Sequence, residues 1–106
     1  MKIYIACPHT HGDVAQNVRA AIDAAHAIRE AGHTPLVPVL SHFWHMIHPR
    51  AYEDWLAMDL EWLEVCDAVV RLPGHSPGAD RETAAAAGRM PIYWSLDAFL
   101  EAHGKD

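Results

Sequence analysis

Apolar and polar positions change along the chain in blocks that predict alternating strands and helices. Residues 2–6 are a short apolar run rich in β-formers, as in a buried strand. From Asp13 onward apolar residues recur at helical spacing until Gly32, and Asp13 with Gln16 has the pattern of a helix cap. The expected strands are 2–6, 34–39, 67–72 and 91–94, and the expected helices run from 13 to the cap at 32, from about 49 to 65, from 78 to 87, and from 97 to 103.

This order predicts an α/β fold with a doubly wound parallel sheet, flavodoxin-like or Rossmann-like. We expect about four strands in the order 2-1-3-4, with helices on both faces and a single domain over residues 1–106. Prolines at 35 and 38 favour a sheet edge for the second strand. In such sheets ligands bind beyond the carboxyl ends of the strands, where the strand order reverses. The expected crevice is lined by residues 7–12 and 72–78 and by the long connection 40–50.

Composition excludes several classes of partner. The formal charge is −6 and basic residues form no cluster, so a nucleic acid polymer is not an expected partner. No apolar run approaches the roughly 18 residues of a membrane span, and we expect no membrane association. Cys7 and Cys66 lie outside any C-x-x-C motif, which favours a reduced, cytoplasmic setting.

Asp59 is the most informative single residue. On a helical wheel of residues 51–66, Trp55, Leu63 and other apolar residues share one face, and Asp59 falls near its middle. A carboxylate there is costly unless it is paired or faces a polar cavity. One interpretation is a working acid in a cleft; the other is an internal cap or an ion pair with an arginine such as Arg71.

Glu82 and Ser76 mark a second candidate site. Glu82 lies about one turn into the helix expected from residue 78, where the helix dipole favours its charged form. Such a carboxylate can be a nucleophile. The other interpretation is the ordinary preference for acidic residues near a helix N-terminus. Ser76 followed by Pro77 is a common helix start, and the same geometry can hold an anion.

Histidines are frequent in two segments, at 9 and 11 and at 42, 45 and 48. The second group shares one face only if the segment is helical, and neither group is joined by a cysteine or carboxylate at the spacing of known zinc motifs. We therefore expect no metal. A better interpretation is a partly mobile lid in which Phe43, Trp44 and the histidines cover a flat ligand.

Three segments together are similar to a known family. Met58–Leu63, Cys66–Val70 and the spacing Ser76-x-Gly78-x-x-x-Glu82 resemble the nucleoside 2-deoxyribosyltransferase superfamily and its hydrolytic branch, the 2′-deoxynucleoside 5′-phosphate N-hydrolases. The opening Tyr4–Pro8 and Leu72–Gly74 look closest to small uncharacterised members of that superfamily. The resemblance covers residues 2–94.

This resemblance implies cleavage of the N-glycosidic bond of a nucleoside, deoxynucleoside or nucleotide, without a cofactor. It implies that Glu82 attacks the anomeric carbon or stabilises its cation, that Asp59 handles the leaving base and its proton, and that Tyr4 lies near the nucleophile. The expected substrate-binding residues are Cys7, Pro8, His9, Gly12, His45, Ser76 and Gly78.

Departures from the family pattern refine these expectations. The phosphate-hydrolase branch has a serine and an arginine where this chain has Pro8-His9-Thr10, which weakens the expectation of a 5′-phosphate. The transferases use a C-terminal asparagine from a neighbouring subunit, and 101–106 contains none, which favours hydrolysis over transfer. The family implies a homodimer or larger assembly. The alternative function is a nucleotide-sensing module that binds without chemistry and needs neither Glu82 nor Asp59.

Overall fold

A computed structural model, which describes residues 1–104, shows a four-stranded parallel sheet in the order β2-β1-β3-β4. The strands are β1 (Lys2–Ala6), β2 (Thr34–Leu36), β3 (Ala68–Arg71) and β4 (Ile92–Tyr93). The fold class and strand order predicted from the sequence are therefore confirmed.

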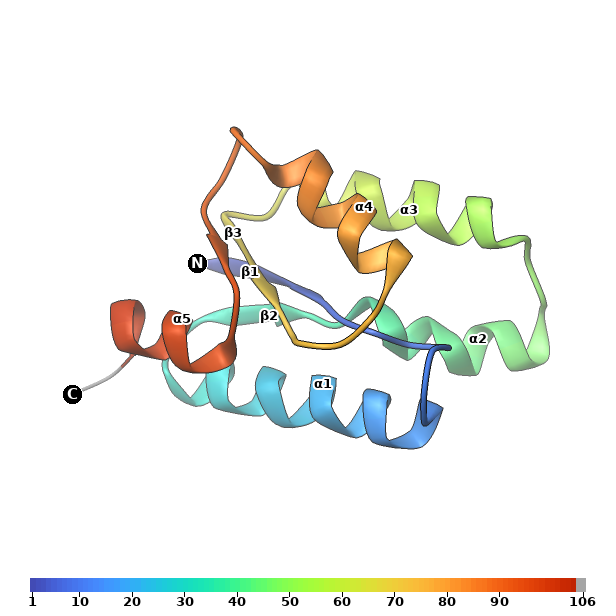
Figure 1. The fold of residues 1–106 in the computed structure, drawn as a ribbon, viewed down its shortest axis with the longest axis horizontal. Coiled ribbons are helices and arrows are strands. Elements are labelled where there is room, and N and C mark those ends of the chain that lie inside the picture. Colours follow the sequence, from blue (N-terminus) through green and yellow to red (C-terminus); the bar gives the residue numbers. More distant parts are fainter. Residues whose placement is uncertain (105–106) are drawn as a thin grey trace.

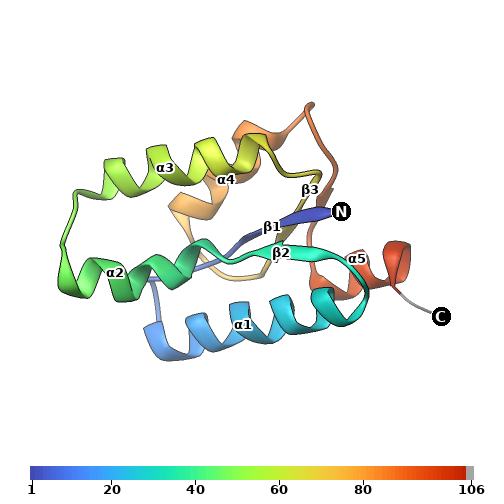
Figure 2. The same cartoon turned by 180° about the vertical axis from the view of Figure 1, so that it is seen from behind.

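Helices cover both faces of the sheet (Figures 1 and 2). Helices α1 (Val14–Glu30) and α5 (Leu96–His103) lie on one face, and α3 (Tyr52–Glu64) and α4 (Pro77–Ala86) on the other. Strand β1 serves both layers, because its side chains alternate between the faces. Ile3 and Ile5 belong to the core with α1 and α5, whereas Tyr4 and Ala6 belong to the core with α3 and α4.

The ends of α1 follow their sequence signals. The Asp13 side chain accepts a hydrogen bond from the Gln16 amide at 3.1 Å and so caps the first turn. At the other end Gly32 adopts a φ of 92°, while the amides of Gly32 and His33 donate to the carbonyls of Arg29 and Ile28. This pattern is a Schellman cap, so the helix boundaries predicted at both ends are confirmed.

The segment after β2 differs from the prediction. The second strand stops at Leu36 instead of residue 39, because Pro38 lacks the amide that a strand ladder needs and begins a 3-10 turn at Pro38–Leu40. The expected connection over residues 40–50 contains a helix, α2 (Ser41–Ile47). Helix α3 begins at Tyr52, later than the position near Pro49 that we expected.

Helix α2 is only partly covered by the rest of the chain. Phe43, Trp44, Met46 and Ile47 are all exposed, Ile47 most of all at 75%. None of the helices within residues 1–104 has the length and apolar character required to cross a membrane.

The sheet places two loops side by side at its carboxyl edge. Ala6, the last residue of β1, pairs with Arg71, the last residue of β3, and the Leu72 amide donates to the Ala6 carbonyl at 2.9 Å. The loops over residues 7–12 and 72–76 therefore leave adjacent strands at the point where the strand order reverses. This is the position predicted for a ligand.

Candidate functional site

A pocket of about 620 Å³ opens at this edge of the sheet. It is lined by the loop after β1, by α2 and α3, and by the start of α4. Its polar lining residues are Cys7, His9, Thr10, His11, Ser41, His45, Arg50, Tyr52, Trp55, Asp59, Ser76, Arg81 and Glu82. The volume falls in the range of small-molecule sites. The crevice expected from the sequence is thus present.

Glu82 is buried at the base of this pocket and is held by Tyr4. The fully buried Tyr4 hydroxyl donates a hydrogen bond to Glu82 Oε2. Burial raises the pKa of Glu82 to about 7, and the nearby Asp59 adds to the rise. The Tyr4 hydrogen bond and the Arg71 charge act in the opposite direction. Because burial and the Glu82 charge raise the pKa of Tyr4, the phenol stays protonated and remains a donor.

The start of α4 brings Glu82 to this position. Ser76 caps the helix by accepting a hydrogen bond from the Ala79 amide at 3.1 Å, and Pro77 occupies the first turn. Ala79 and Ala86 are buried on the same helix face as Glu82, and their small side chains let α4 approach the sheet. The cap predicted at Ser76 is confirmed, and the helix begins at Pro77, one residue before the expected start.

Gly78 makes room for a neighbour from α3. A β-carbon at this position would lie 2.9 Å from the Tyr52 hydroxyl, which is closer than packed atoms allow. Tyr52 in turn lies beneath the Arg81 guanidinium, 5.7 Å from its ring centre. Helices α3 and α4 therefore meet closely at the pocket wall.

Asp59 faces the pocket from α3. Within the described part of the chain its side chain makes no hydrogen bond or ion pair with protein groups, and burial raises its pKa to about 6. The alternative ion pair with Arg71 is not formed, because Arg71 bonds elsewhere. The helical wheel also places Trp62 on the apolar face of this helix, but its side chain is 55% exposed. The buried face of α3 is therefore narrower than predicted.

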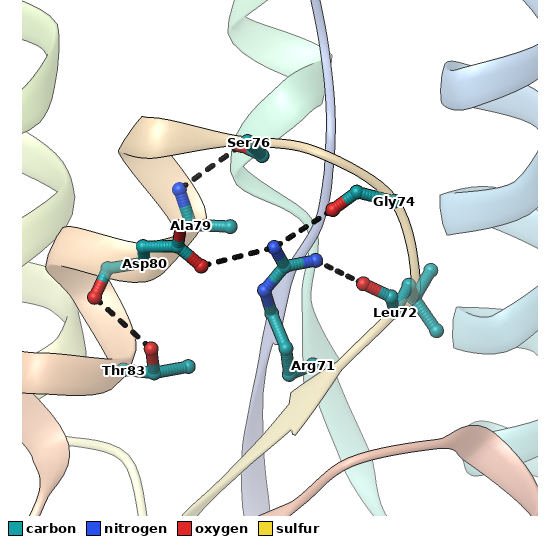
Figure 3. Close-up of polar contacts among 7 residues, drawn as sticks. All are labelled: Arg71, Leu72, Gly74, Ser76, Ala79, Asp80 and Thr83. Atoms are coloured by element: carbon teal, nitrogen blue, oxygen red, sulfur yellow. Dashed lines mark hydrogen bonds and ion pairs between the residues drawn. The ribbon is translucent and has the colours of Figure 1, made fainter.

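Arg71 fastens the loop that leads into α4 (Figure 3). Its buried guanidinium donates to the carbonyls of Leu72 and Gly74, the latter at 2.9 Å, and reaches Asp80 Oδ1 at 3.2 Å. Asp80 is itself 67% exposed, so the ion pair is partly screened and the carbonyl bonds carry more of the restraint. The guanidinium thus fixes residues 72–76 and places a positive charge near Glu82.

The loop after β1 is fixed from α1. The Asn17 amide donates to the carbonyls of His9 and His11 at 3.0 and 2.8 Å. Burial raises the pKa of Cys7 to about 12, with Glu82 contributing; the thiol is therefore uncharged at neutral pH and is a poor nucleophile. Burial lowers the pKa of His9, and the neighbouring His42 and His45 lower it further.

The predicted substrate-binding residues divide into two groups. Cys7, His9, His45, Ser76 and Gly78 line the pocket, whereas Pro8 and Gly12 do not. Pro8 instead packs closely against Gly74. A β-carbon at residue 74 would lie only 2.9 Å from Pro8 Cγ.

Two arginines at the pocket were missed by sequence reasoning. Arg50 is paired with Asp54, and Arg81 with Glu53 at 3.0 Å, so their charges are already balanced. The i,i+4 spacing of Arg50 and Asp54 was a usable signal. Arg81 and Glu53 are too far apart in sequence for any local pattern to reveal them.

Metal ligands do not gather in the described residues. Across residues 1–104 no three His, Cys, Asp or Glu side chains are arranged to hold a metal ion. Helix α2 gives His42 and His45 the helical form that the metal alternative required, but it ends before His48, and His45 accepts hydrogen bonds from Trp55 and Arg50.

Weakening the hydrogen bonds of Arg71 to the Leu72 and Gly74 carbonyls is expected to destabilise the loop before α4. Arg71→Lys cannot reach both carbonyls in the same plane, so we expect the free energy of unfolding to fall by about 1–3 kcal/mol. Urea denaturation followed by circular dichroism measures this. The matched control is Arg19→Lys, which alters an exposed ion pair with Asp23 and is expected to change stability by less than about 0.5 kcal/mol. Equal losses of unfolding free energy in the two variants would contradict this role of Arg71.

Comparison with known proteins gives a family and a fold relative. No curated protein matches the chain. Among solved structures, a 2-deoxyribosyltransferase from the psychrotolerant bacterium Bacillus psychrosaccharolyticus, described as a biocatalyst for synthesis of antiviral and antitumoral nucleosides, superposes with a TM-score of 0.60. The two are 21% identical, and the match covers 87% of this chain and 69% of that one. At this identity the likeness establishes a shared fold. Residues 1–94 match the family described as a domain of unknown function, DUF7768, and the chain belongs to that family.

Proposed function

We propose that this protein cleaves the N-glycosidic bond of a nucleoside, deoxynucleoside or nucleotide, with Glu82 as the nucleophile. The observation that carries the proposal is the buried Glu82 carboxyl, held by Tyr4 in a pocket that also contains Asp59. The enzymatic fold relative and the family resemblance of residues 2–94 support the same chemistry.

The two carboxyls suit the two ends of the breaking bond. Cleavage of a C–N glycosidic bond develops positive charge on the sugar and negative charge on the base. One Glu82 oxygen is occupied by the Tyr4 hydroxyl, which leaves the other free to attack. Asp59 makes no hydrogen bond or ion pair with residues 1–104, and its pKa is raised to about 6. In its protonated form it can therefore donate to the departing base.

The proposed reaction has two steps. In the first, Glu82 forms an ester bond to the anomeric carbon, the C–N bond breaks with its electron pair going to the base, and the Asp59 proton moves to the base. In the second, water attacks the anomeric carbon, Glu82 leaves as a carboxylate, and Asp59 accepts the proton of the water. Hydrolysis is the proposed outcome; a second base in place of water would give transfer.

The charges of the pocket residues favour a neutral substrate over a phosphorylated one. Both pocket arginines are paired with carboxylates, and burial favours the neutral form of His9. A 5′-phosphate would therefore lack an unpaired cation to bind. We propose that the sugar lies toward Glu82, Ser76 and Gly78, and that the base lies toward Asp59.

Replacing the nucleophile tests the proposal. Glu82→Gln preserves shape but cannot attack, so base release from a nucleoside and nucleotide panel is expected to fall by more than roughly 10³-fold. Chromatography of free base measures the rate, and adding a second base shows whether transfer occurs. The control is Glu64→Gln on the exposed face of α3. No base release by the wild-type protein, or full activity in Glu82→Gln, would refute the catalytic role.

The pH profile of kcat/KM is expected to be bell-shaped with its maximum between pH 6 and 7. Glu82, whose pKa is about 7, must be ionised to attack, and Asp59, whose pKa is about 6, must be protonated to donate. The fraction of protein in this form rises with pH up to the lower pKa and falls above the higher one. The active form therefore carries one proton, on Asp59.

The alkaline limb of that profile can be assigned with Tyr4→Phe. The Tyr4 hydrogen bond lowers the pKa of Glu82, so its loss is expected to raise that pKa, the higher of the two, and to move the alkaline limb to higher pH. A limb that does not move, or a profile that is flat between about pH 5 and 8, would argue against these two roles.

We also propose that the chain forms a homodimer or a larger homo-oligomer that covers the exposed side chains of α2. Met46 and Ile47 are 66% and 75% exposed, which is unusual for large apolar residues. Sedimentation equilibrium is expected to show association that Ile47→Glu weakens. Ile22→Glu, at an exposed apolar position on α1, is the matched control. A wild-type monomer at all concentrations would contradict this proposal.

A further inference from the structure

His45 has its Nδ1 atom occupied by two groups that can only donate. The indole N–H of Trp55 approaches Nδ1 at 2.9 Å, and the backbone N–H of Arg50 approaches the same atom at 3.1 Å. Neither group can accept a hydrogen bond. Nδ1 must therefore be the unprotonated nitrogen, and the neutral ring carries its proton on Nε2.

The surroundings keep this ring in place. Trp44, which precedes His45 on α2, packs edge-on against Trp55 with ring centres 5.0 Å apart. The His45 and Trp55 rings also meet, 5.9 Å apart. Because α2 is held to α3 by aromatic packing as well as by the hydrogen bonds, His45 can rotate only if these contacts break.

His45 lies on the wall of the pocket that carries Asp59. His45, Trp55 and Asp59 all line the pocket, and Trp55 precedes Asp59 by four residues on α3, which places the two side chains on one helix face. Glu82 and Ser76 come from α4. Because Nδ1 is already occupied, the Nε2–H is the polar group that His45 has left to offer a ligand in this pocket.

We infer that His45 is a specificity-determining residue that donates its Nε2–H to a hydrogen-bond acceptor on the edge of the nucleobase. The inference rests on the proposed function for the identity of the ligand. A base that presents a ring nitrogen or a carbonyl oxygen there is favoured. A base that presents an N–H is rejected, because two donors would face each other and His45 cannot reverse its tautomer without losing the Trp55 and Arg50 bonds.

A base fits this donor better than a sugar or a phosphate. Sugar hydroxyls both donate and accept, so a fixed tautomer would not discriminate among them. A phosphate at this wall would lack an unpaired cation, because Arg50 is paired with Asp54. Unprotonated ring nitrogens and carbonyl oxygens of bases only accept, whereas ring N–H and amino groups donate, and the positions of these groups differ between bases. A locked donor can therefore distinguish one base from another.

The tautomer is tested in the free protein, without any substrate. Long-range ¹H–¹⁵N correlation spectra distinguish protonated from unprotonated ring nitrogens, and we expect His45 to be protonated at Nε2 alone. Trp55→Phe removes one donor while keeping an aromatic ring, so the Nδ1–H form is expected to become detectable. A wild-type ring protonated at Nδ1 would overturn the inference whatever the protein catalyses.

Recognition is tested by binding of free bases, which does not depend on catalysis. The probes are adenine and cytosine and their deaza analogues, in which one ring nitrogen becomes C–H. We expect wild-type protein to bind one parent base roughly 5–10-fold more tightly than one of its deaza analogues, the range typical of one neutral hydrogen bond.

Two substitutions then distinguish the roles of the two ring nitrogens of His45. His45→Asn can still accept from Trp55 but lacks a donor at the Nε2 position, so the preference for the parent base is expected to fall to about one-fold. His45→Gln places an amide donor near the Nε2 position and is expected to recover part of the preference. The control is His48→Asn, which lies outside the pocket lining. A preference that survives in His45→Asn, or equal or absent binding of all the bases, would overturn the inference. Failure of the proposed catalysis would instead appear as base binding without base release.

Discussion

The buried hydrogen bond between the Tyr4 hydroxyl and the Glu82 carboxylate is the interaction on which the site depends. It joins the centre of the sheet to α4, and it keeps an acidic group in a place where burial alone would favour its neutral form. A buried carboxylate without a partner would be costly. With Tyr4 beneath it and the Arg71 charge nearby, Glu82 can be ionised near neutral pH and still lie in a largely apolar pocket.

The residues around this pair hold Glu82 within reach of the Tyr4 hydroxyl. Ala79 and Ala86 keep α4 close enough to the sheet for Glu82 to reach Tyr4. Ser76 fixes where the helix begins, and Arg71 fixes the loop before it. The opposite wall, formed by α2 and α3, supplies Asp59 and His45. One end of the pocket thus stabilises positive charge, and the other offers a proton and a fixed donor.

The sequence was sufficient for the strand order, for the caps at Asp13 and Ser76, and for the unusual place of Asp59. Each of these rests on a local pattern: alternating blocks, a capping residue, or a polar residue on an apolar face. Helix α2 was not predicted, because it has no capping side chain at its start and its stability comes from packing on α3. The role of Arg71 was missed for a related reason. A residue at the end of a strand does not reveal which carbonyls its side chain will meet.

The most direct test of the account is to look for the covalent intermediate on Glu82. A nucleoside whose sugar carries a 2′-fluoro group forms a glycosyl ester that hydrolyses slowly, because fluorine destabilises the cationic transition state. After rapid denaturation and proteolysis, mass spectrometry is expected to find the sugar attached to the peptide that contains Glu82, together with an equal amount of released base. Base release with no adduct on that peptide, or an adduct at another residue, would contradict the account.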